Sequence, residues 1–388
     1  MSPQSKKEYL KSIVHRYKKA NRKDKKNILD EFCNVCGYHR KYAIKLLNNT
    51  FARVNPKPKK QKKKGRRSVY NKKTIINALK EIWKASNFPC SKILKAIIPI
   101  WLPGYEETFS SLSCEDKKLI LAISPATIDR LLKPIRPKIN KRGLCTTKPG
   151  TLIKKRIPIQ TNQWDESRPG FVESDTVAHC GSSTAGQYAL TIDLVDIATG
   201  WTEQRAIWGK GQLGVRDNLA HIESTLPFPL LGFDSDNGSE FLNYHILRFY
   251  QNRKKPVKFT RSRPYYKNDN AHVEQKNWSI IRQELGYDRF DNPDIVPLLN
   301  ELYCNEWRLY NNFFRPSVKL ISKKRAAAKI IKKHDAPKTP HQRILESSYI
   351  AKSTKDALNA IFSLLNPFVL RKAIDAKTDN ILKLASPY

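Results

Sequence analysis

Three acidic residues could carry chemistry because of where they fall in the sequence. Asp175 lies within "FVESDTVAH", a strand-like segment in which a charge faces inward or sits at a sheet edge. Asp236 ends a second such segment before the turn signal Asn237-Gly238, and Glu274 lies on a helical segment after "KNDNAH". Carboxylates brought together repel one another, and divalent cations relieve that repulsion.

The chemistry that these acids could support is phosphoryl transfer. Carboxylate oxygens suit Mg²⁺, or Mn²⁺, and we expect two ions in the site. Such a pair clamps the attacking and leaving oxygens of an in-line displacement, so one phosphodiester is cut by water and another is attacked by a 3′-hydroxyl. Glu173 and Asp234 share strand faces with Asp175 and Asp236, and periodicity excludes neither as an alternative.

The elements that must position the acids begin near residue 170. β-branched and aromatic residues predict strands in "GFVESDTVAHC", "GQYALTIDLVDIATGWTEQRAIW", "PLLGFDSD" and "VKFTRS", and the second segment turns at Thr199-Gly200. Helical patterns follow the first three strands, at 212–225, 239–252 and 271–285. Three strands followed by alternating helices and strands predict a mixed α/β domain.

The chain ahead of this domain reads as two helical units. Residues 1–50 contain a helix, a break at Gly37 and a basic helix, which is the outline of a helix-turn-helix. Residues 70–135 end in a similar helix that Ser124 can cap, so we expect a second helical, helix-turn-helix-like DNA-binding unit there. We assign the remaining parts as two linkers, the mixed domain and a small helical ending of unassigned role: 51–69, 136–168, 169–335 and 336–388.

Charge dominates the composition, because 72 Lys+Arg face 35 Asp+Glu in 388 residues, a formal net charge of +37. Such an excess attracts a polyanion, and we expect double-stranded DNA rather than a membrane surface or an acidic protein. Three groups of residues are predicted to contact DNA. They lie on the helix after Gly37, in the first linker and around the third acid: Arg40, Lys41, Lys45; Lys57, Lys59, Lys60, Lys62, Lys63, Lys64, Arg66, Arg67; and Arg261, Arg263, Lys267, Asn268, Lys276.

Cysteine use and hydropathy argue against several other classes. Seven scattered Cys favour reduced thiols over a disulfide framework. Cys33 and Cys36 form a C-x-x-C without a second ligand pair, which favours helix packing over the alternative of zinc binding. No stretch is apolar enough to span a bilayer, and the first residues lack a hydrophobic segment. We therefore expect a cytoplasmic protein with no membrane partner and no small-molecule substrate.

Three pieces, "ESDTVAHCG", "DSDNGSEF" and "NDNAHVEQKNW", resemble the catalytic core of retroviral integrases and of bacterial insertion-sequence transposases with an integrase-type core. The family motif is Asp, then Asp in a D-N-G-S-x-F turn, then Glu, and its metal-binding acids fall on Asp175, Asp236 and Glu274. The 37 residues between the last two are slightly more than the retroviral spacing. The His-His-Cys-Cys zinc domain of retroviral integrases has no counterpart, so no zinc is carried over.

The resemblance implies an RNase H-like fold with a five-stranded mixed sheet, preceded by helix-turn-helix units. It also implies a DDE-type transposase, acting at the bacterial nucleoid. Joining two DNA ends implies a homo-oligomer in the DNA complex. Two alternatives stay open, a non-catalytic regulator derived from a transposable element and a metal-dependent nuclease that does not join DNA.

Overall fold

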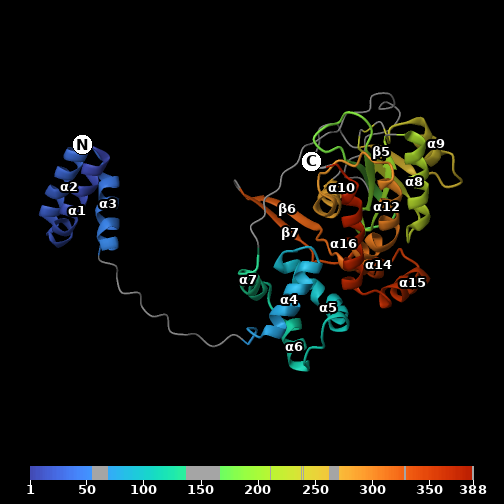
Figure 1. Ribbon diagram of the computed structural model, residues 1–388, viewed down its shortest axis with the longest axis horizontal. Coiled ribbons are helices and arrows are strands. Elements are labelled where there is room, and N and C mark those ends of the chain that lie inside the picture. The colour runs from blue at the N-terminus through green and yellow to red at the C-terminus, as the bar shows by residue number, and fades with distance from the viewer. Residues whose placement is uncertain are drawn as a thin grey trace. The chain divides into compact units, whose positions relative to one another are not determined.

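The computed structural model describes residues 1–54, 69–136, 167–209, 211–236, 238, 240–261, 271–326 and 329–386 (Figure 1). The side chains of residues 50–54, 271–272, 326 and 329 are outside this description. The chain divides into two compact units, Met1–Ser68 and Val69–Tyr388. Each unit has its own core and is described by itself.

The first unit consists of three helices, α1 (Pro3–Lys19), α2 (Arg22–Cys36) and α3 (Arg40–Val54). Apolar residues at helical spacing form its core around Phe32, which is fully buried. The predicted break is confirmed at Gly37, which ends α2 in the left-handed conformation with a φ of 65°. Cys36 is a buried core residue at the end of α2.

A five-stranded mixed sheet is the centre of the second unit. Its strands are β1 (Phe171–Ala178), β2 (Ala189–Asp196), β3 (Thr202–Trp208), β4 (Gly232–Ser235) and β5 (Lys258–Arg261), in the spatial order β3-β2-β1-β4-β5. The first three strands are antiparallel neighbours, and β4 and β5 run parallel to β1. The predicted fold class is confirmed, because a helical N-terminal region precedes a sheet with the strand order of the RNase H-like core.

Two helices cover one face of this sheet. They are α8 (Gln212–Thr225) and α9 (Tyr244–Gln251), which lie side by side (Figure 1). Alternate apolar residues of the strands, among them Ile192 and Phe233, pack against this pair. The helix predicted to begin at residue 239 begins at Tyr244, because the Asn243 side chain accepts a hydrogen bond from the Ile246 N–H at 3.0 Å and caps it there.

The other face is covered by helices from far along the chain. They are α10 (Ala271–Lys276), the π-helical η1 (Asn277–Arg282), α11 (Gln283–Leu285), α12 (Ile295–Leu302), the π-helical η2 (Tyr303–Trp307) and α13 (Arg308–Phe314). Their buried residues share one core with Val177 and Ala206 of the sheet. Because α10 and η1 pack on β1, they bring the segment around Glu274 to the same face as Asp175.

Helices from both ends of the second unit join this core. The four earlier ones are α4 (Lys73–Ala85), α5 (Ser91–Thr108), α6 (Cys114–Ala122) and α7 (Pro125–Leu132), and the three later ones are α14 (Pro340–Glu346), α15 (Lys352–Ser363) and α16 (Pro367–Lys383). The Trp101 ring on α5 meets Phe368 of α16 edge-on at 5.2 Å, and its Nε1 donates to the Phe314 carbonyl at 3.2 Å. The predicted Ser124 cap of α7 is confirmed, because its hydroxyl accepts from the Thr127 N–H at 3.2 Å.

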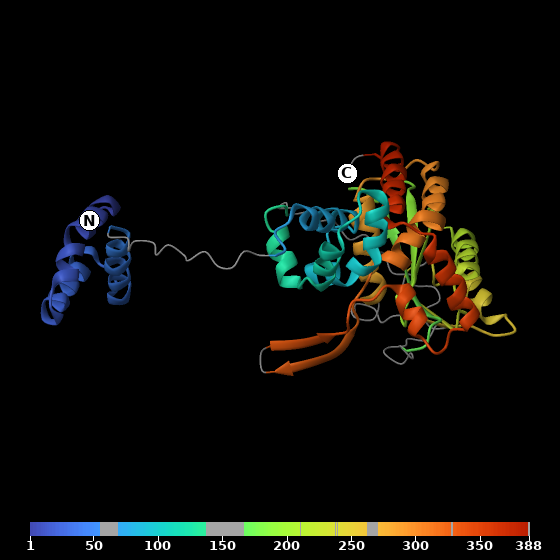
Figure 2. The same cartoon turned by 90° about the horizontal axis from the view of Figure 1, so that it is seen from below.

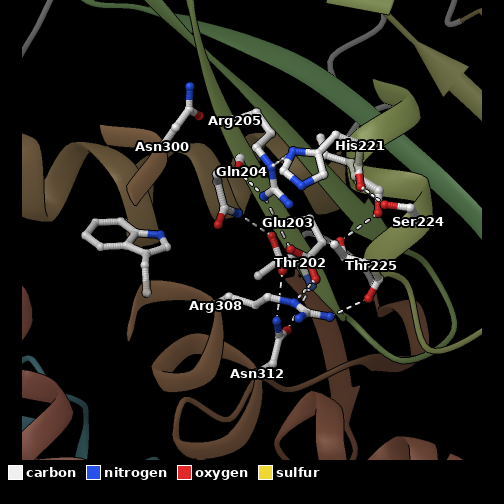
Figure 3. A network of polar contacts seen from close by, with 12 residues as sticks. Thr202, Glu203, Gln204, Arg205, His221, Ser224, Thr225, Asn300, Arg308 and Asn312 are labelled. Carbon is white, nitrogen blue, oxygen red and sulfur yellow. Dashed lines mark hydrogen bonds and ion pairs between the residues drawn. The ribbon is translucent and has the colours of Figure 1, made fainter. Parts of the chain in front are cut away.

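The outer edge of β3 is closed by side chains (Figure 3). Asn312 accepts from the Thr202 N–H and donates to its carbonyl, both at 2.9 Å. Asn300 makes the same pair of hydrogen bonds with Ala206, at 2.8 and 2.9 Å. The Arg205 guanidinium donates to the Gln204 carbonyl between them at 2.6 Å. These groups take the places that a sixth strand would occupy.

A two-stranded hairpin follows α13. Its strands are β6 (Leu320–Ala326) and β7 (Lys329–His334), and they form a sheet of their own. Figures 1 and 2 show it extending out from the sheet and its covering helices, on the side of the second unit where α4–α7 lie. No strand was predicted in this part of the chain, so the hairpin is a finding of the structure.

Across the described residues, we find no single helix with both the length and the apolar character needed to cross a membrane. Helices α15 and α16 meet that criterion only when they are taken together, as a pair bent by 76°.

Candidate active site

Two of the three predicted acids meet where strands β1 and β4 diverge. The parallel pairing of these strands ends at Ser174 and Ser235, so Asp175 and Asp236 are the next residues on each. The carboxyl ends of parallel strands are a common place for sites in α/β folds. Burial raises the pKa of Asp175 well above its ordinary value, and the negative charge of Asp236 raises it further. Because the two strands are paired up to the preceding residues, the two carboxylates belong to one site.

A tight turn presents Asp236. Its Oδ1 accepts a hydrogen bond from the Gly238 N–H at 2.8 Å, which holds the carboxylate against its own backbone. A Cβ on Gly238 would lie 2.7 Å from Glu240 Cδ and 2.8 Å from Asp236 Oδ1. The glycine therefore fits closely here, because an added side chain would require the ends of the Asp236 and Glu240 side chains to shift.

The helix carrying the third acid is pinned to β1 by two hydrogen bonds. The Val273 N–H donates to Glu173 Oε2 at 3.1 Å, and the Asn277 amide donates to Asp175 Oδ2 at 2.7 Å. Glu274 lies one helical turn before Asn277, on the neighbouring position of the same face. Its side chain is exposed. The structure therefore brings the helix of Glu274 to the Asp175 strand.

Sequence reasoning missed three polar residues around this pair: Asp193, Glu240 and Asn277. Asp193 is paired directly opposite Asp175 in the antiparallel register, and Glu240 Oε1 accepts from the Thr176 hydroxyl at 2.8 Å. One oxygen of each of the three, Asp193 Oδ2, Glu240 Oε2 and Asn277 Oδ1, is buried without a hydrogen-bond partner among the described residues. Glu240 stands inside the quoted "DSDNGSEF" motif, so its position was the available signal.

The chemistry of this site fits a hard divalent cation. Its donors are all oxygens, its two aspartates repel each other, and it contains buried oxygens that lack a donor. Within the described residues, no group of three or more His, Cys, Asp or Glu side chains stands close enough to hold a metal. Asp175 and Asp236 are thus the part of the predicted triad that the fold brings together, while Glu274 stands on the adjoining helix.

The two alternative acids have partners inside the fold. Glu173 is buried and accepts from the backbone at the start of α10, as described above. Asp234 is also buried and accepts from the Thr260 hydroxyl at 2.5 Å. Both carboxylates therefore hold neighbouring elements in place, which favours Asp175 and Asp236 for the site.

The predicted DNA contacts of the second unit divide into two groups. Lys276 is half-buried, and its pKa is lowered to about 8, mainly by burial and by Arg315, although the charge of Asp193 opposes this. This placement favours an internal role for Lys276 over a phosphate contact. Arg261 is buried at the end of β5. Arg263, Lys267 and Asn268 lie outside the described residues.

In the first unit, the predicted contacts on α3 are exposed. Lys41 and Lys45 lie one turn apart on the surface of the helix, and Arg40 forms an ion pair with Asp30. The linker residues lie outside the described part of the chain: Lys57, Lys59, Lys60, Lys62, Lys63, Lys64, Arg66 and Arg67.

Comparisons with known proteins place the chain among relatives. No protein-family model matches it. Among solved structures, the catalytic core domain of BIV integrase matches 46% of this chain and 96% of its own, with a TM-score of 0.29 and 16% identity. A chain of the simian T-cell lymphotropic virus intasome in complex with PP2A regulatory subunit B56 gamma matches 47% of this chain and 59% of its own, with a TM-score of 0.27 and 14% identity. The fold is identified from the strand order of the sheet, β3-β2-β1-β4-β5.

A curated protein from Sinorhizobium fredii (strain NBRC 101917 / NGR234), "Uncharacterized protein y4rM", is 39% identical over 340 residues. The match covers 87% of this chain and 94% of that protein. At this identity and coverage, the chain belongs to the same family as y4rM.

Proposed function

We propose that the chain is a DDE-type transposase that cuts the ends of a mobile DNA element and joins them to target DNA. The observation that carries the proposal is the meeting of Asp175 and Asp236 at the diverging ends of β1 and β4. Two half-buried carboxylates that repel each other are costly in a structural protein, whereas a cation-dependent phosphoryl transferase needs them. The D-N-G-S-x-F motif around Asp236 supports the same reading.

The residues of the site would divide the work between holding and positioning. Asp175, Asp236 and Glu274 would hold divalent ions, Mg²⁺ or Mn²⁺. Two bound ions would supply the positive charge that stabilises the attacking and leaving oxygens of the displacement. Asn277 orients Asp175 through its 2.7 Å hydrogen bond, and the Gly238 N–H orients Asp236. Such positioning matters because misplaced groups lose much of their catalytic effect.

Recognition of DNA ends would fall to the helical units. The exposed Lys41 and Lys45 on α3, after the Gly37 turn, support a helix-turn-helix whose second helix enters the major groove. We propose a homo-oligomer in the DNA complex, because two ends must be joined together, and action on DNA at the bacterial nucleoid in the cytoplasm.

A strand-transfer assay tests the proposal. Purified chain, labelled DNA carrying the sequences that flank the gene, a plasmid target and Mg²⁺ or Mn²⁺ are combined, beside the Glu274→Gln variant. Joined products that need the metal and vanish with the variant are expected. Cleavage without joining would instead establish a nuclease, and DNA binding with neither activity would establish a regulator.

A further inference from the structure

The β6–β7 hairpin (Leu320–Ala326 and Lys329–His334) has a composition that its fold does not explain. Its two strands contain six Lys and Arg, and no acidic residue lies between Glu306 and Asp335. The exposed cations are Lys323, Lys324, Arg325, Lys332 and Lys333. Ile330 and Ile331 are also exposed, at 56% and 59% of their surface. An isolated two-stranded hairpin is only marginally stable in water, so this one is suited to a partner.

The base of the hairpin is firmly attached to the second unit. Ser317 and Lys338 exchange backbone hydrogen bonds at 3.0 and 3.1 Å. Closer to the strands, Asp335 accepts from the Lys319 N–H at 2.6 Å and forms an ion pair with Arg343, also at 2.6 Å. Because its base is held in this way, the β6–β7 hairpin keeps its cations at a fixed position away from the core (Figure 2).

The pairing of β6 with β7 distributes the cations over both faces of the hairpin. Lys323 is paired with Lys332 on one face, and Arg325 is paired with Ile330 on that same face. Lys324 with Ile331, and Ser322 with Lys333, occupy the other face. A membrane-binding ribbon would separate an apolar face from a basic face. Each face of this hairpin has both basic and apolar side chains. A partner with negative charge on two sides matches this distribution.

The direct pairing of Lys323 with Lys332 is unfavourable in the free protein. Like charges opposite each other on neighbouring strands destabilise a sheet. Two backbone phosphates lying beside the pair, one for each ammonium group, would neutralise both charges and relieve this repulsion on binding.

We propose that the β6–β7 hairpin is a DNA-binding arm that enters the major groove of duplex DNA, with its two faces toward the two phosphate backbones. The major groove is about 12 Å wide and admits a two-stranded ribbon. Cations on both faces contact the walls of the groove, and the exposed isoleucines contact base edges such as thymine methyl groups. The inference rests on the proposed function only in taking duplex DNA as the polyanion.

Salt-dependent binding of the full-length chain to a short, labelled duplex of mixed sequence tests this arm. The Lys323→Ala/Lys332→Ala variant is compared with a matched control, Lys352→Ala/Lys372→Ala, which removes two exposed lysines from α15 and α16. Each lost phosphate contact reduces the slope of log K against log salt by about 0.9. We therefore expect the hairpin variant to lose a slope of about 2, while the control keeps the wild-type slope.

Two further measurements keep the proposal falsifiable without relying on one variant. Amide hydrogen exchange in β6 and β7 of the wild-type chain should slow when DNA is added. Methyl green, which occupies the major groove, should remove the hairpin-dependent part of binding, and netropsin, which occupies the minor groove, should leave it.

Several outcomes would overturn the proposal. Equal slopes for the two double variants would exclude the hairpin from DNA binding. Loss of binding to phosphatidylserine–phosphatidylcholine vesicles, with DNA binding unchanged, would make it a membrane arm. Loss of self-association alone would make it a contact between copies of the chain.

A hairpin-dependent slope in a chain that shows no strand transfer would leave this inference intact while the proposed function fails.

Discussion

Two clusters of charged residues in the sheet are arranged in opposite ways. At β3, Glu203 is fully buried, but Arg308 and Arg205 surround it and the Trp201 Nε1 donates to it at 2.9 Å (Figure 3). At the diverging ends of β1 and β4, Asp175 faces Asp236, Asp193 and Glu240, all of the same sign. The first cluster pairs opposite charges, whereas the second consists mainly of carboxylates, with Lys276 as an opposite charge near Asp193.

This difference separates stability from function. Opposite charges can stay buried as an ion pair, whereas carboxylates that repel one another are retained where a ligand or a reaction uses them. Changes at β3 should therefore affect folding, and changes at the acid pair should affect activity. The predictions below test that separation in order of expected effect.

The largest effect is expected for Asp236→Asn. Cleavage with Mg²⁺ should fall by more than about 10³-fold, because the variant removes one carboxylate that would hold the ions. Its melting temperature should stay the same or rise, because the repulsion with Asp175 is removed. Cleavage assays, anisotropy with DNA ends and thermal melting measure the three quantities. An equal loss of cleavage and of end binding would mean that the site is misplaced.

At β3, Glu203→Ala should have the reverse profile. Removing the carboxylate leaves Arg205 buried without its counter-charge, which costs about 3–5 kcal/mol of unfolding free energy. Glu223→Ala serves as the control, because its bidentate pair with Arg253 is partly exposed and should contribute only about 1 kcal/mol or less. Urea unfolding of both variants measures the two losses of unfolding free energy. Equal losses would contradict a special role of the Glu203 cluster in stability.

Asp193 should make the stability of the acid cluster depend on pH. Burial raises its pKa from 3.8 to about 6 despite hydrogen bonds from Gln204 and Thr202. The folded state therefore binds the proton more tightly, so the carboxylate destabilises the fold once ionised. Asp193→Asn keeps an acceptor for both donors. Its free energy of unfolding, measured by urea unfolding at several pH values, should equal that of wild type below about pH 4 and exceed it by about 3 kcal/mol above about pH 6. If the difference in unfolding free energy between the variant and wild type is constant across this pH range, the raised pKa of Asp193 is contradicted.

The smallest effect is expected for Gly238→Ala. The added methyl group would press on Asp236 and Glu240 at 2.7–2.8 Å, so cleavage should fall by roughly 10–100-fold while stability changes little. Gly214→Ala on α8 is the matched control, because no heavy atom lies within 4 Å of its added Cβ. If both variants cleave at the wild-type rate, the turn does not constrain the acids.

Much of the sheet could be predicted from the sequence, because its strands alternate β-branched residues with clear turn signals. The 212–225 helix coincides with α8, and Gly200 adopts the left-handed conformation expected at the turn after Thr199. The pairing of Asp175 with Asp236 could be placed only through a resemblance, since periodicity could not separate them from Glu173 and Asp234. The role of Glu274, the metal ions and the domain boundaries stay predictions.

Other features depend on contacts that no local pattern contains. The packing of Trp101 on Phe314 and Phe368 joins segments more than 200 residues apart in the sequence. The β6–β7 hairpin was missed because lysines interrupt its alternation, and its tip lacks the Asn-Gly or Asp-Gly pair that marks tight turns. Asn277 was missed because an amide near an acid has no distinguishing signal in one sequence.

The closed edge of β3 has a consequence for how copies of this protein can meet. A sheet edge with free N–H and C=O groups recruits further strands, which is a common route to aggregation. Here Asn300 and Asn312 occupy those groups with amides that belong to helices, so the ladder ends within the molecule. Copies of the chain that came together, as the proposed homo-oligomer would require, would therefore not polymerise through this edge.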